Sequence, residues 1–295
     1  MLAPDVCVQA EFLKMPKIFV RDKNSDEKVF IEYVSNFDLS QTFDCGQCFR
    51  WNKNGNSYSG VAFDRELEVF SEDEEIIFTG TTTEKFNSIW KNYFDFSTDY
   101  KKIGENFSNF NPVLKKAHEF CPGIRILKQD FWETLCSFII SQNNNIPRIK
   151  KIISSLCEQF GNKLENNYSF PTAEKLSLLN ENDLQPIKSG FRAKYIIDAA
   201  QKIASGEVNL QKISTMPIEN AREELKKIKG VGNKVADCVL LYGMHRLESF
   251  PMDVWMKRVM DYFFPGQTPE IFGDYAGIAQ QYLYHYSRSN PEIFE

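Results

Sequence analysis

The chain has 295 residues, enough for one large domain or two ordinary ones, and its apolar content of 42% can fill sizeable cores. No apolar run approaches the roughly 20 residues of a membrane-spanning helix, so no membrane span is expected. The net charge of −5 does not by itself indicate a polyanionic partner, but residues 144–234 hold 15 Lys and Arg against 10 Asp and Glu. This basic middle fits a local phosphate-binding face, although an excess of this size also arises by ordinary variation.

Residues 1–28 lack a basic segment followed by an apolar one, so they are not expected to act as a secretory signal. We predict a flexible, loosely attached N-terminal segment here. The chain has seven cysteines, an odd number at irregular spacing, which indicates reduced thiols inside a cell. The expected compartment is the cytoplasm of a prokaryote, or the nucleus if the source is eukaryotic.

Residues 29–110 are predicted to form an antiparallel sheet domain with flanking helices. Short segments rich in β-branched and aromatic residues alternate with turn sequences, and Asn54-Gly55 is a typical hairpin turn. Several segments alternate apolar and polar residues, as expected when one face of a sheet is buried. After them, Glu84–Phe94 carries apolar residues at helical spacing. The expected strands are 29–37, 47–52, 57–63, 65–71 and 75–80.

Cys45-Gly-Gln-Cys48 is a lone CxxC sequence within the sheet domain. Such a pair serves in other proteins as a redox centre or as half of a zinc site. Zinc needs two further ligands, and the sequence offers no second CxxC or nearby histidine pair. A structural role is therefore favoured over metal binding.

Residues 111–295 read as successive helices of roughly 8–16 residues joined by short connectors. Prolines stand where helices start or connectors run. A small sheet domain followed by an all-helical domain is an α+β fold. The expected helices are 112–120, 130–141, 146–160, 173–179, 192–205, 217–228, 233–243, 253–264 and 275–288.

Leu225–Cys238 reads as a helix, a Gly-Val-Gly hairpin and a second helix. Gly230 and Gly232, on either side of Val231, allow positive φ and close approach to another molecule. Amides exposed beside the start of the second helix favour a phosphate. The simpler alternative is a tight turn between packed helices, but the flanking lysines favour a grip on a nucleic-acid backbone.

Lys234 begins the second helix, and Asp253 follows nineteen residues later, just before another helix. A neutral amine that attacks the anomeric carbon of deoxyribose would expel the base and leave an imine to the sugar. An ionised carboxylate would stabilise the oxocarbenium-like sugar. The alternatives are a lysine that contacts only phosphate and an aspartate that caps its helix, and capping is compatible with catalysis.

These motifs together resemble the 8-oxoguanine DNA glycosylase/AP lyase family of the helix–hairpin–helix (HhH-GPD) superfamily, over residues 30–290. Lys234 and Asp253 match the family's nucleophile and catalytic aspartate. The resemblance implies a monomer that flips 8-oxoguanine out of duplex DNA, excises it and cleaves the strand by β-elimination. It implies that no cofactor is required, and that a structural monovalent cation lies at the backbone carbonyls of Lys226, Ile228 and Val231.

The resemblance also assigns the interhelical loop of residues 141–148 to DNA binding. Asn143, beside Asn144, would fill the space that the flipped base leaves, and Arg148 would hydrogen-bond the unpaired cytosine. A plain polar loop is the alternative. Pro147 departs from the expected pattern at the residue before Arg148, which leaves the opposite-base preference open.

Phe191 is assigned as an aromatic wedge in the base stack and Arg192 as a second reader of the cytosine. A core aromatic is the alternative for Phe191, and exposure of its ring would distinguish the two. Trp255 is expected to pack against the active-site wall, against a flanking phosphate or in the core.

The resemblance places Cys238 and Tyr284 on either side of the extruded base, with Gln280 on its Watson–Crick edge. Gln280 and Tyr284 are four residues apart, so they share a helix face. The carbonyl of Gly46 would accept a hydrogen bond from N7–H of 8-oxoguanine, where guanine has a lone pair. Core packing is the alternative for Cys238 and Tyr284, and a plain turn for Gly46.

Two other functions remain open at this stage. One is a monofunctional alkyl-base glycosylase of the same fold, and the other is a non-catalytic module that binds the DNA backbone. Lys234 and the 8-oxoguanine-like pocket disfavour the first. Substituting Lys234 by Gln separates all three.

Overall fold

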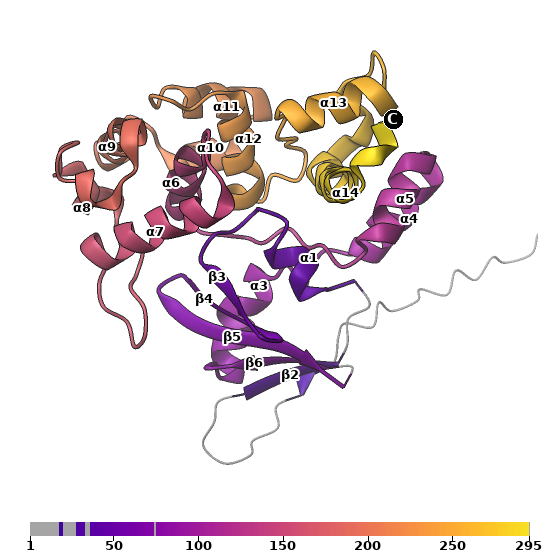
Figure 1. Ribbon diagram of the computed structural model, residues 1–295, viewed down its shortest axis with the longest axis horizontal. Helices are drawn as coiled ribbons and strands as arrows, with labels where there is room; N and C mark the ends of the chain where they lie inside the picture. The colour runs from indigo at the N-terminus through magenta and orange to yellow at the C-terminus, as the bar shows by residue number, and fades with distance from the viewer. Residues whose placement is uncertain (1–17, 20–27, 33–35, 74, 295) are drawn as a thin grey trace, which may run out of the picture.

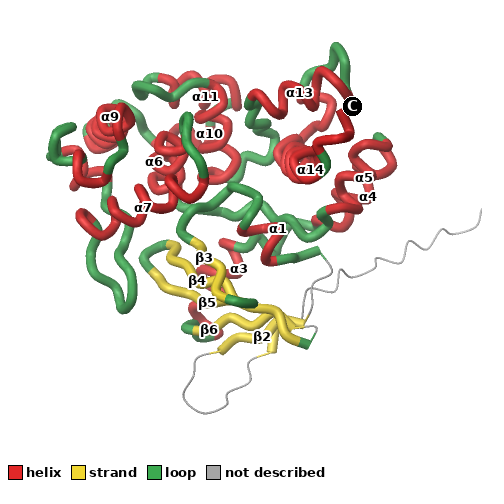
Figure 2. Tube along the Cα trace, viewed as in Figure 1, coloured by secondary structure: helices red, strands yellow, loops and turns green. Residues whose placement is uncertain are grey.

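The structure, a computed structural model, describes residues 18–19, 28–32, 36–73 and 75–294. Its first part is an antiparallel sheet with flanking helices, and its second part is a larger group of helices (Figure 1). Figure 2 shows the same division by colour, with the yellow strands gathered below the red helices. This α+β arrangement confirms the fold class predicted from the sequence. Within the described residues, no helix has the length and apolarity that crossing a bilayer requires.

Six strands form the sheet in the order β1-β2-β6-β5-β4-β3, and every neighbouring pair is antiparallel. Val29 and Ile31 of β2 are fully buried, as alternation on one covered face predicts. An aromatic cluster that includes Trp51, Phe78 and Phe94 fills this core. The strands are β1 (Ile18–Phe19), β2 (Lys28–Glu32), β3 (Trp51–Asn54), β4 (Ser57–Ala62), β5 (Arg65–Glu72) and β6 (Glu75–Thr79).

The segment before β3 differs from the expectation. The expected strand 47–52 begins only at Trp51, because residues 44–50 form the turn that follows the short helix α1 (Leu39–Phe43). Asp38 caps α1: its Oδ1 accepts a hydrogen bond from the amide of Gln41 at 2.8 Å. This local cap starts a helix in a stretch between two predicted strands, where no element was expected.

The predicted hairpin turn at Asn54-Gly55 is confirmed, since it joins β3 to β4 and Gly55 has φ +61°. The expected N-terminal segment, by contrast, contains a strand, because β1 pairs with β2. Residues 1–17 and 20–27 of that segment lie outside the described residues.

The helices follow the predicted spans closely, and residues 84–94 are helical as expected. The helices are α2 (Thr83–Lys85), η1 (Phe86–Trp90), α3 (Lys91–Tyr93), α4 (Tyr100–Phe110), α5 (Pro112–Phe120), α6 (Phe131–Ser141), α7 (Ile146–Phe160), α8 (Ala173–Ser177), η2 (Gln185–Ile187), η3 (Gly190–Arg192), α9 (Ala193–Ala204), α10 (Leu210–Thr215), α11 (Ile218–Lys226), α12 (Asn233–Cys238), η4 (Val239–Gly243), α13 (Val254–Phe263), η5 (Pro269–Tyr275), α14 (Ala276–Ser289) and η6 (Pro291–Phe294).

Helices α4 and α10 were not predicted. Helix α4 contains Gly104, and glycine in a helix interior lowers helix propensity. The packing of α4 on α5 explains this glycine, because a Cβ at Gly104 would lie 2.1 Å from the ring of His118. Tertiary contact therefore stabilises a helix that its own sequence disfavours.

A buried carboxylate joins the sheet domain to the end of the η4 helix. The Asp95 side chain has no exposed surface, and it lies 2.9 Å from Nζ of Lys128 and 3.0 Å from Nε2 of His245. The hydroxyl of Tyr100 donates to it at 2.9 Å. Burial acts to raise the pKa of Asp95, but His245 and the other partners prevail and lower it to about 2. The ionised form is therefore part of the folded structure.

We expect the contribution of Asp95 to stability to fall in acid. Its folded pKa is depressed, so the contribution is present above the unfolded pKa of about 4 and is lost as pH falls toward 2. Asp95→Asn should cost about 2–3 kcal/mol of unfolding free energy at pH 7, and about 1.5 kcal/mol of this should disappear by pH 2.5. Urea unfolding at both pH values measures the difference. The exposed Asp261→Asn is the control, and a pH-independent cost would contradict the prediction.

Candidate active site

A cavity of about 240 Å³ lies between the sheet domain and the helical domain. It gathers residues from the loop after α1, from α6, α12 and α14, and from the start of α13. The residues predicted for chemistry and base binding therefore meet in one place. Its lining includes Cys45, Gly46, Phe49, Phe138, Ser141, Asn144, Ile146, Ile149, Lys234, Cys238, Tyr242, Pro251, Asp253, Gln280, Gln281 and Tyr284.

Lys234 lies in the first turn of α12, and its side chain extends over two stacked aromatic rings. Its Nζ is 5.1 Å from the ring centroid of Phe138, and Phe138 stacks on Tyr242 at 5.4 Å. Within the described part of the chain, no carboxylate forms an ion pair with this amine. The ring face holds the amine at the cavity, beside the thiol of Cys238.

Cys238 lies one turn after Lys234 and is buried. Burial raises the pKa of the Cys238 thiol to about 11, although the charge of Lys234 acts in the opposite direction. The thiol is therefore neutral near neutral pH. A neutral, polarisable sulfur suits a wall against which a planar base can pack.

Asp253 caps α13. Its Oδ1 accepts a hydrogen bond from the backbone amide of Met256 at 2.7 Å, which fixes the carboxylate at the cavity wall. The capping interpretation and the catalytic interpretation are therefore compatible, as expected. The side chain is half-buried.

Gly46 has φ +88°, a conformation that favours glycine, and it lines the cavity. The next residue, Gln47, has no exposed surface and fixes this turn. The Nε2 of Gln47 donates to the carbonyls of Thr42 at 2.8 Å and Arg125 at 2.7 Å. Its Oε1 accepts from the amide of Leu127 at 2.9 Å. The turn that carries Gly46 is thereby fixed to the segment that leads into α6.

A row of amides and a phenol crosses the cavity floor. Gln280 is buried and accepts a hydrogen bond from Nε2 of Gln281 at 2.7 Å. Gln281 also donates to the hydroxyl of Tyr242 at 2.6 Å. Sequence reasoning named Gln280 but missed Gln281 and Tyr242, because their roles depend on contacts between distant segments.

The hairpin between α11 and α12 differs from the expectation at one glycine. Gly230 has φ +77°, and a Cβ there would lie 2.4 Å from the ring of Tyr195. Gly232 instead has an extended backbone with φ −101°, and a Cβ there would meet open space. Only Gly230 therefore requires glycine for its conformation. The open surface at Gly232 leaves room for another molecule to approach α12.

The loop that carries Asn143 and Arg148 lies beside Arg192. Asn143 is exposed with φ +47°, and Arg148 is exposed at the start of α7. Arg192 differs from the expectation: it is buried, and its guanidinium donates to the backbone carbonyls of Gln142 and Asn143. Its hydrogen-bonding groups hold the loop, so in this structure Arg192 positions Asn143 and does not present its donors to solvent.

Asn144 is half-buried and lines the cavity, with its Nδ2 donating to the carbonyl of Ile140 at 3.1 Å. Phe191 lies in η3 and is 48% exposed. Its ring contacts Tyr195 edge-on at 5.9 Å. An exposed aromatic ring of this size agrees with the wedge interpretation rather than the core interpretation.

Family models match nearly all of this architecture. The N-terminal domain of 8-oxoguanine DNA glycosylase matches residues 29–135, and the HhH-GPD superfamily of base excision DNA repair proteins matches residues 136–270. The chain belongs to the HhH-GPD 8-oxoguanine DNA glycosylase family. The N-glycosylase/DNA lyase of Saccharomyces cerevisiae is 35% identical over 252 residues, which cover 75% of this chain and 66% of the yeast protein.

Solved structures of this glycosylase family share the whole fold. MBOgg1, in complex with a low-affinity DNA ligand, is 45% identical with a TM-score of 0.86, over 92% of this chain and 99% of that chain. The Clostridium acetobutylicum 8-oxoguanine glycosylase/lyase was solved with duplex DNA that contains cytosine opposite 8-oxoguanine. It is 40% identical with a TM-score of 0.86, over 95% of this chain and 100% of that chain.

The two cysteines of the CxxC sequence pack inside the protein as free thiols. Cys45 and Cys48 are buried free thiols, and the Cys45 Sγ lies 3.2 Å from the carbonyl of Thr42. Burial raises the pKa of the Cys45 thiol to about 12. In the described ranges, no group of three or more His, Cys, Asp or Glu is placed to hold a metal ion.

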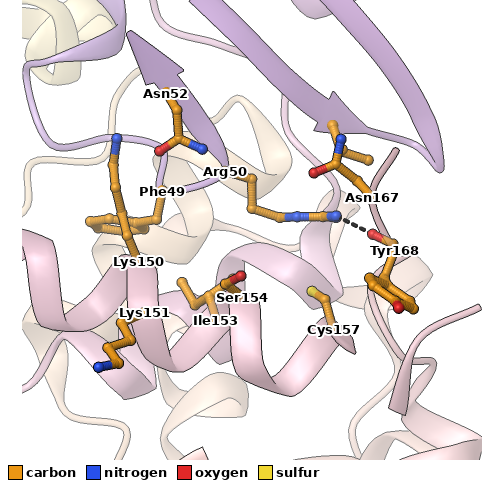
Figure 3. A pocket seen from close by; sticks show the side chains of 11 residues that line it. Phe49, Arg50, Asn52, Lys150, Lys151, Ile153, Ser154, Cys157, Asn167 and Tyr168 are labelled. Carbon is orange, nitrogen blue, oxygen red and sulfur yellow. Dashed lines mark hydrogen bonds between the residues drawn. The ribbon is translucent and has the colours of Figure 1, made fainter. Parts of the chain in front are cut away.

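A second cavity, of about 280 Å³, lies beside the first and shares Phe49 with it. Figure 3 shows Arg50 pointing across this cavity to the backbone carbonyl of Tyr168. Lys150 of α7 donates to the carbonyl of Trp51 in β3. These cationic side chains bind backbone carbonyls of neighbouring segments, so this cavity marks a junction between β3 and α7.

We expect Gln47→Ala to destabilise the protein by about 3–5 kcal/mol. The substitution leaves the amide of Leu127 and the carbonyls of Thr42 and Arg125 without these partners, and each such buried group costs about 1–3 kcal/mol. Urea unfolding monitored by circular dichroism measures the loss. Gln159→Ala, at an exposed position of α7, is the control. A loss below 1 kcal/mol would show that the Gln47 hydrogen bonds do not hold the domains together.

Proposed function

We propose that this chain is a bifunctional DNA glycosylase and AP lyase that excises 8-oxoguanine from duplex DNA. The observation that carries the proposal is the meeting of Lys234 and Asp253 in one cavity of about 240 Å³. A cavity of this size takes a flipped base and its sugar. Two relatives support it: the yeast N-glycosylase/DNA lyase and the clostridial 8-oxoguanine glycosylase/lyase. The enzyme would act wherever its DNA is held, the cytoplasm in a prokaryote and the nucleus in a eukaryote.

The chemistry needs only side chains of this chain. Neutral Lys234 attacks the anomeric carbon of the flipped nucleotide, the C–N bond to the base breaks, and the base leaves with the bonding pair and takes a proton. Asp253 stabilises the positive charge that develops on the sugar. The C1′–O4′ bond of the sugar then opens, O4′ takes a proton, and the amine and C1′ form a protonated Schiff base. Loss of a proton from C2′ breaks the C3′–O3′ bond, and the 3′ phosphate departs by β-elimination.

The walls of the cavity explain how the lesion is told from guanine. The Gly46 carbonyl accepts a hydrogen bond from N7–H of 8-oxoguanine, whereas N7 of guanine would set a second acceptor against it. Cys238 and Tyr284 pack on the faces of the base, and Gln280 bonds its Watson–Crick edge. A base in the cavity would exclude water from the half-buried Gly46, which makes two facing acceptors costly and so disfavours guanine.

The cation suggested for the hairpin stays a prediction. The Ile228 carbonyl already accepts a hydrogen bond from the Val231 amide at 3.1 Å. A carbonyl oxygen has two lone pairs, so one remains for a cation together with the carbonyls of Lys226 and Val231. No step of the proposed chemistry passes through this ion.

We expect borohydride to trap wild-type protein covalently on a duplex that contains one 8-oxoguanine opposite cytosine. The Lys234→Gln variant should lose the trapped band and at least about 10³-fold in strand cleavage, because the amine forms the covalent bond. Undamaged and alkylated duplexes serve as controls. Base release by Lys234→Gln at the wild-type rate would favour a monofunctional glycosylase, and DNA binding without base release by the wild type would favour a non-catalytic module.

We expect Phe191→Ala to weaken duplex binding while leaving stability nearly unchanged. The ring is 48% exposed, so its removal should alter the unfolding free energy by less than about 0.5 kcal/mol. Loss of an inserted wedge should weaken binding about tenfold. Fluorescence anisotropy with a labelled duplex measures this. Phe110→Ala, at a 54% exposed aromatic of α4, is the control, and equal effects of both variants would contradict the wedge role.

A further inference from the structure

An aromatic cluster lies beside the predicted catalytic cavity and is tied to it by hydrogen bonds. The indole Nε1 of Trp255 donates to the hydroxyl of Ser287 at 2.7 Å, and that hydroxyl donates to the carbonyl of Tyr284 at 3.3 Å. Trp255 belongs to α13, whose cap is Asp253, and Tyr284 belongs to α14. The indole therefore has a fixed orientation relative to both cavity-forming helices.

Two arginines rest on this cluster. The guanidinium carbon of Arg288 lies 4.9 Å from the ring centroid of Trp255, and that of Arg258 lies 4.2 Å from the ring centroid of Phe294. Phe294 contacts Trp255 edge-on at 5.6 Å, so the four side chains form one unit. Each guanidinium group lies over an aromatic ring. This contact uses none of the guanidinium N–H groups, so they can still donate hydrogen bonds to a ligand.

The charge of these arginines is not neutralised by the described protein. Both side chains are exposed, and neither forms an ion pair with a described carboxylate. Other arginines differ: Arg50 pairs with Glu133 at 3.1 Å, and Arg222 pairs with Asp237 at 2.9 Å. Arg258 and Arg288 therefore present two positive charges to a ligand.

Their position is next to the reacting groups. Tyr284 lines the cavity together with Lys234 and Asp253, and its carbonyl accepts from the Ser287 hydroxyl that holds Trp255, the ring under Arg288. Arg258 follows Asp253 by five residues, about 7.5 Å along α13 at 1.5 Å per residue. A strand whose sugar meets Asp253 would thus carry a phosphate within reach of the two arginines.

We propose that Arg288 and Arg258, which lie over Trp255 and Phe294, bind a backbone phosphate of the DNA strand that carries the flipped nucleotide. The assignment to that strand rests on the proposed function. A phosphodiester is the ligand because a guanidinium edge matches phosphate oxygens and because two cations without carboxylate partners favour a polyanion. Trp255 and Ser287 act as positioning residues for Arg288.

The salt dependence of DNA binding tests the site. Kd is measured between 50 and 200 mM salt in a Lys234→Gln background, so that the 8-oxoguanine duplex is not consumed. Loss of one phosphate contact lowers the slope of log K against log salt by about 0.9. The ratio of Kd for the Arg258→Gln/Arg288→Gln double variant to Kd for its parent should therefore fall about 3.5-fold over this range. Lys175→Gln, at an exposed position of α8, should leave the slope unchanged.

A neutral methylphosphonate at single phosphates identifies the strand. At the bound phosphate it should weaken binding by the parent protein but not by the Arg258→Gln/Arg288→Gln double variant. Arg288→Lys should retain the slope with weaker binding, because it keeps the charge and loses the planar guanidinium. An unchanged slope for the double variant, or a fall in its thermal stability without a slope change, would overturn the proposal.

The result is separable from that of the proposed function. A slope change with undamaged duplex, in a protein that borohydride fails to trap, would refute the glycosylase/lyase activity and leave the phosphate site standing. Borohydride trapping of the wild-type protein, together with an unchanged salt slope for the double arginine variant, would support the glycosylase/lyase activity and refute the phosphate site. An interference signal on the complementary strand would overturn the assignment of the strand.

Discussion

The hydrogen bonds of the buried Gln47 side chain fix the turn at Gly46 to the segment that leads into α6, and the shape of the cavity depends on them. Gly46, Lys234 and Asp253 all line this cavity. The backbone carbonyl of Gln47 also accepts from the side chain of Gln129, whose backbone amide donates to the carbonyl of Tyr242. The turn at Gly46 is thereby connected to η4, which continues the helix that begins beside Lys234.

The cavity keeps its charged groups available by giving each an uncharged support. Asp253 is held by the amide of Met256, and Lys234 lies over the ring of Phe138. A direct ion pair would fix both side chains but would also tie the amine to the carboxylate and leave neither group free to contact the sugar. Arg288 repeats the arrangement with Trp255. Neutral supports leave the charges to interact with a substrate.

Regular elements and isolated chemical motifs could be predicted from the sequence, whereas contacts between distant segments could not. The bounds of α5 and α7 follow from proline at their first turns and from apolar spacing. Lys234 and Asp253 follow from local motifs, and Gly46 follows only from resemblance. Gln47, Gln281 and the buried place of Arg192 arise from tertiary packing, for which the sequence carries no local signal. Helix α4 was missed for the same reason.

The contact between Gly230 and Tyr195 connects two parts of the protein that sequence analysis treated separately. The absence of a side chain at Gly230 lets the hairpin rest on the Tyr195 ring, and that ring in turn supports Phe191. In the proposed function, the hairpin holds the sugar–phosphate chain and Phe191 tests the base stack. Because the hairpin and Phe191 both contact the Tyr195 ring, the position of the hairpin sets how far the Phe191 ring extends from the surface. In the proposed function, the depth to which Phe191 enters the base stack is therefore fixed by the same contact that seats the hairpin on the backbone.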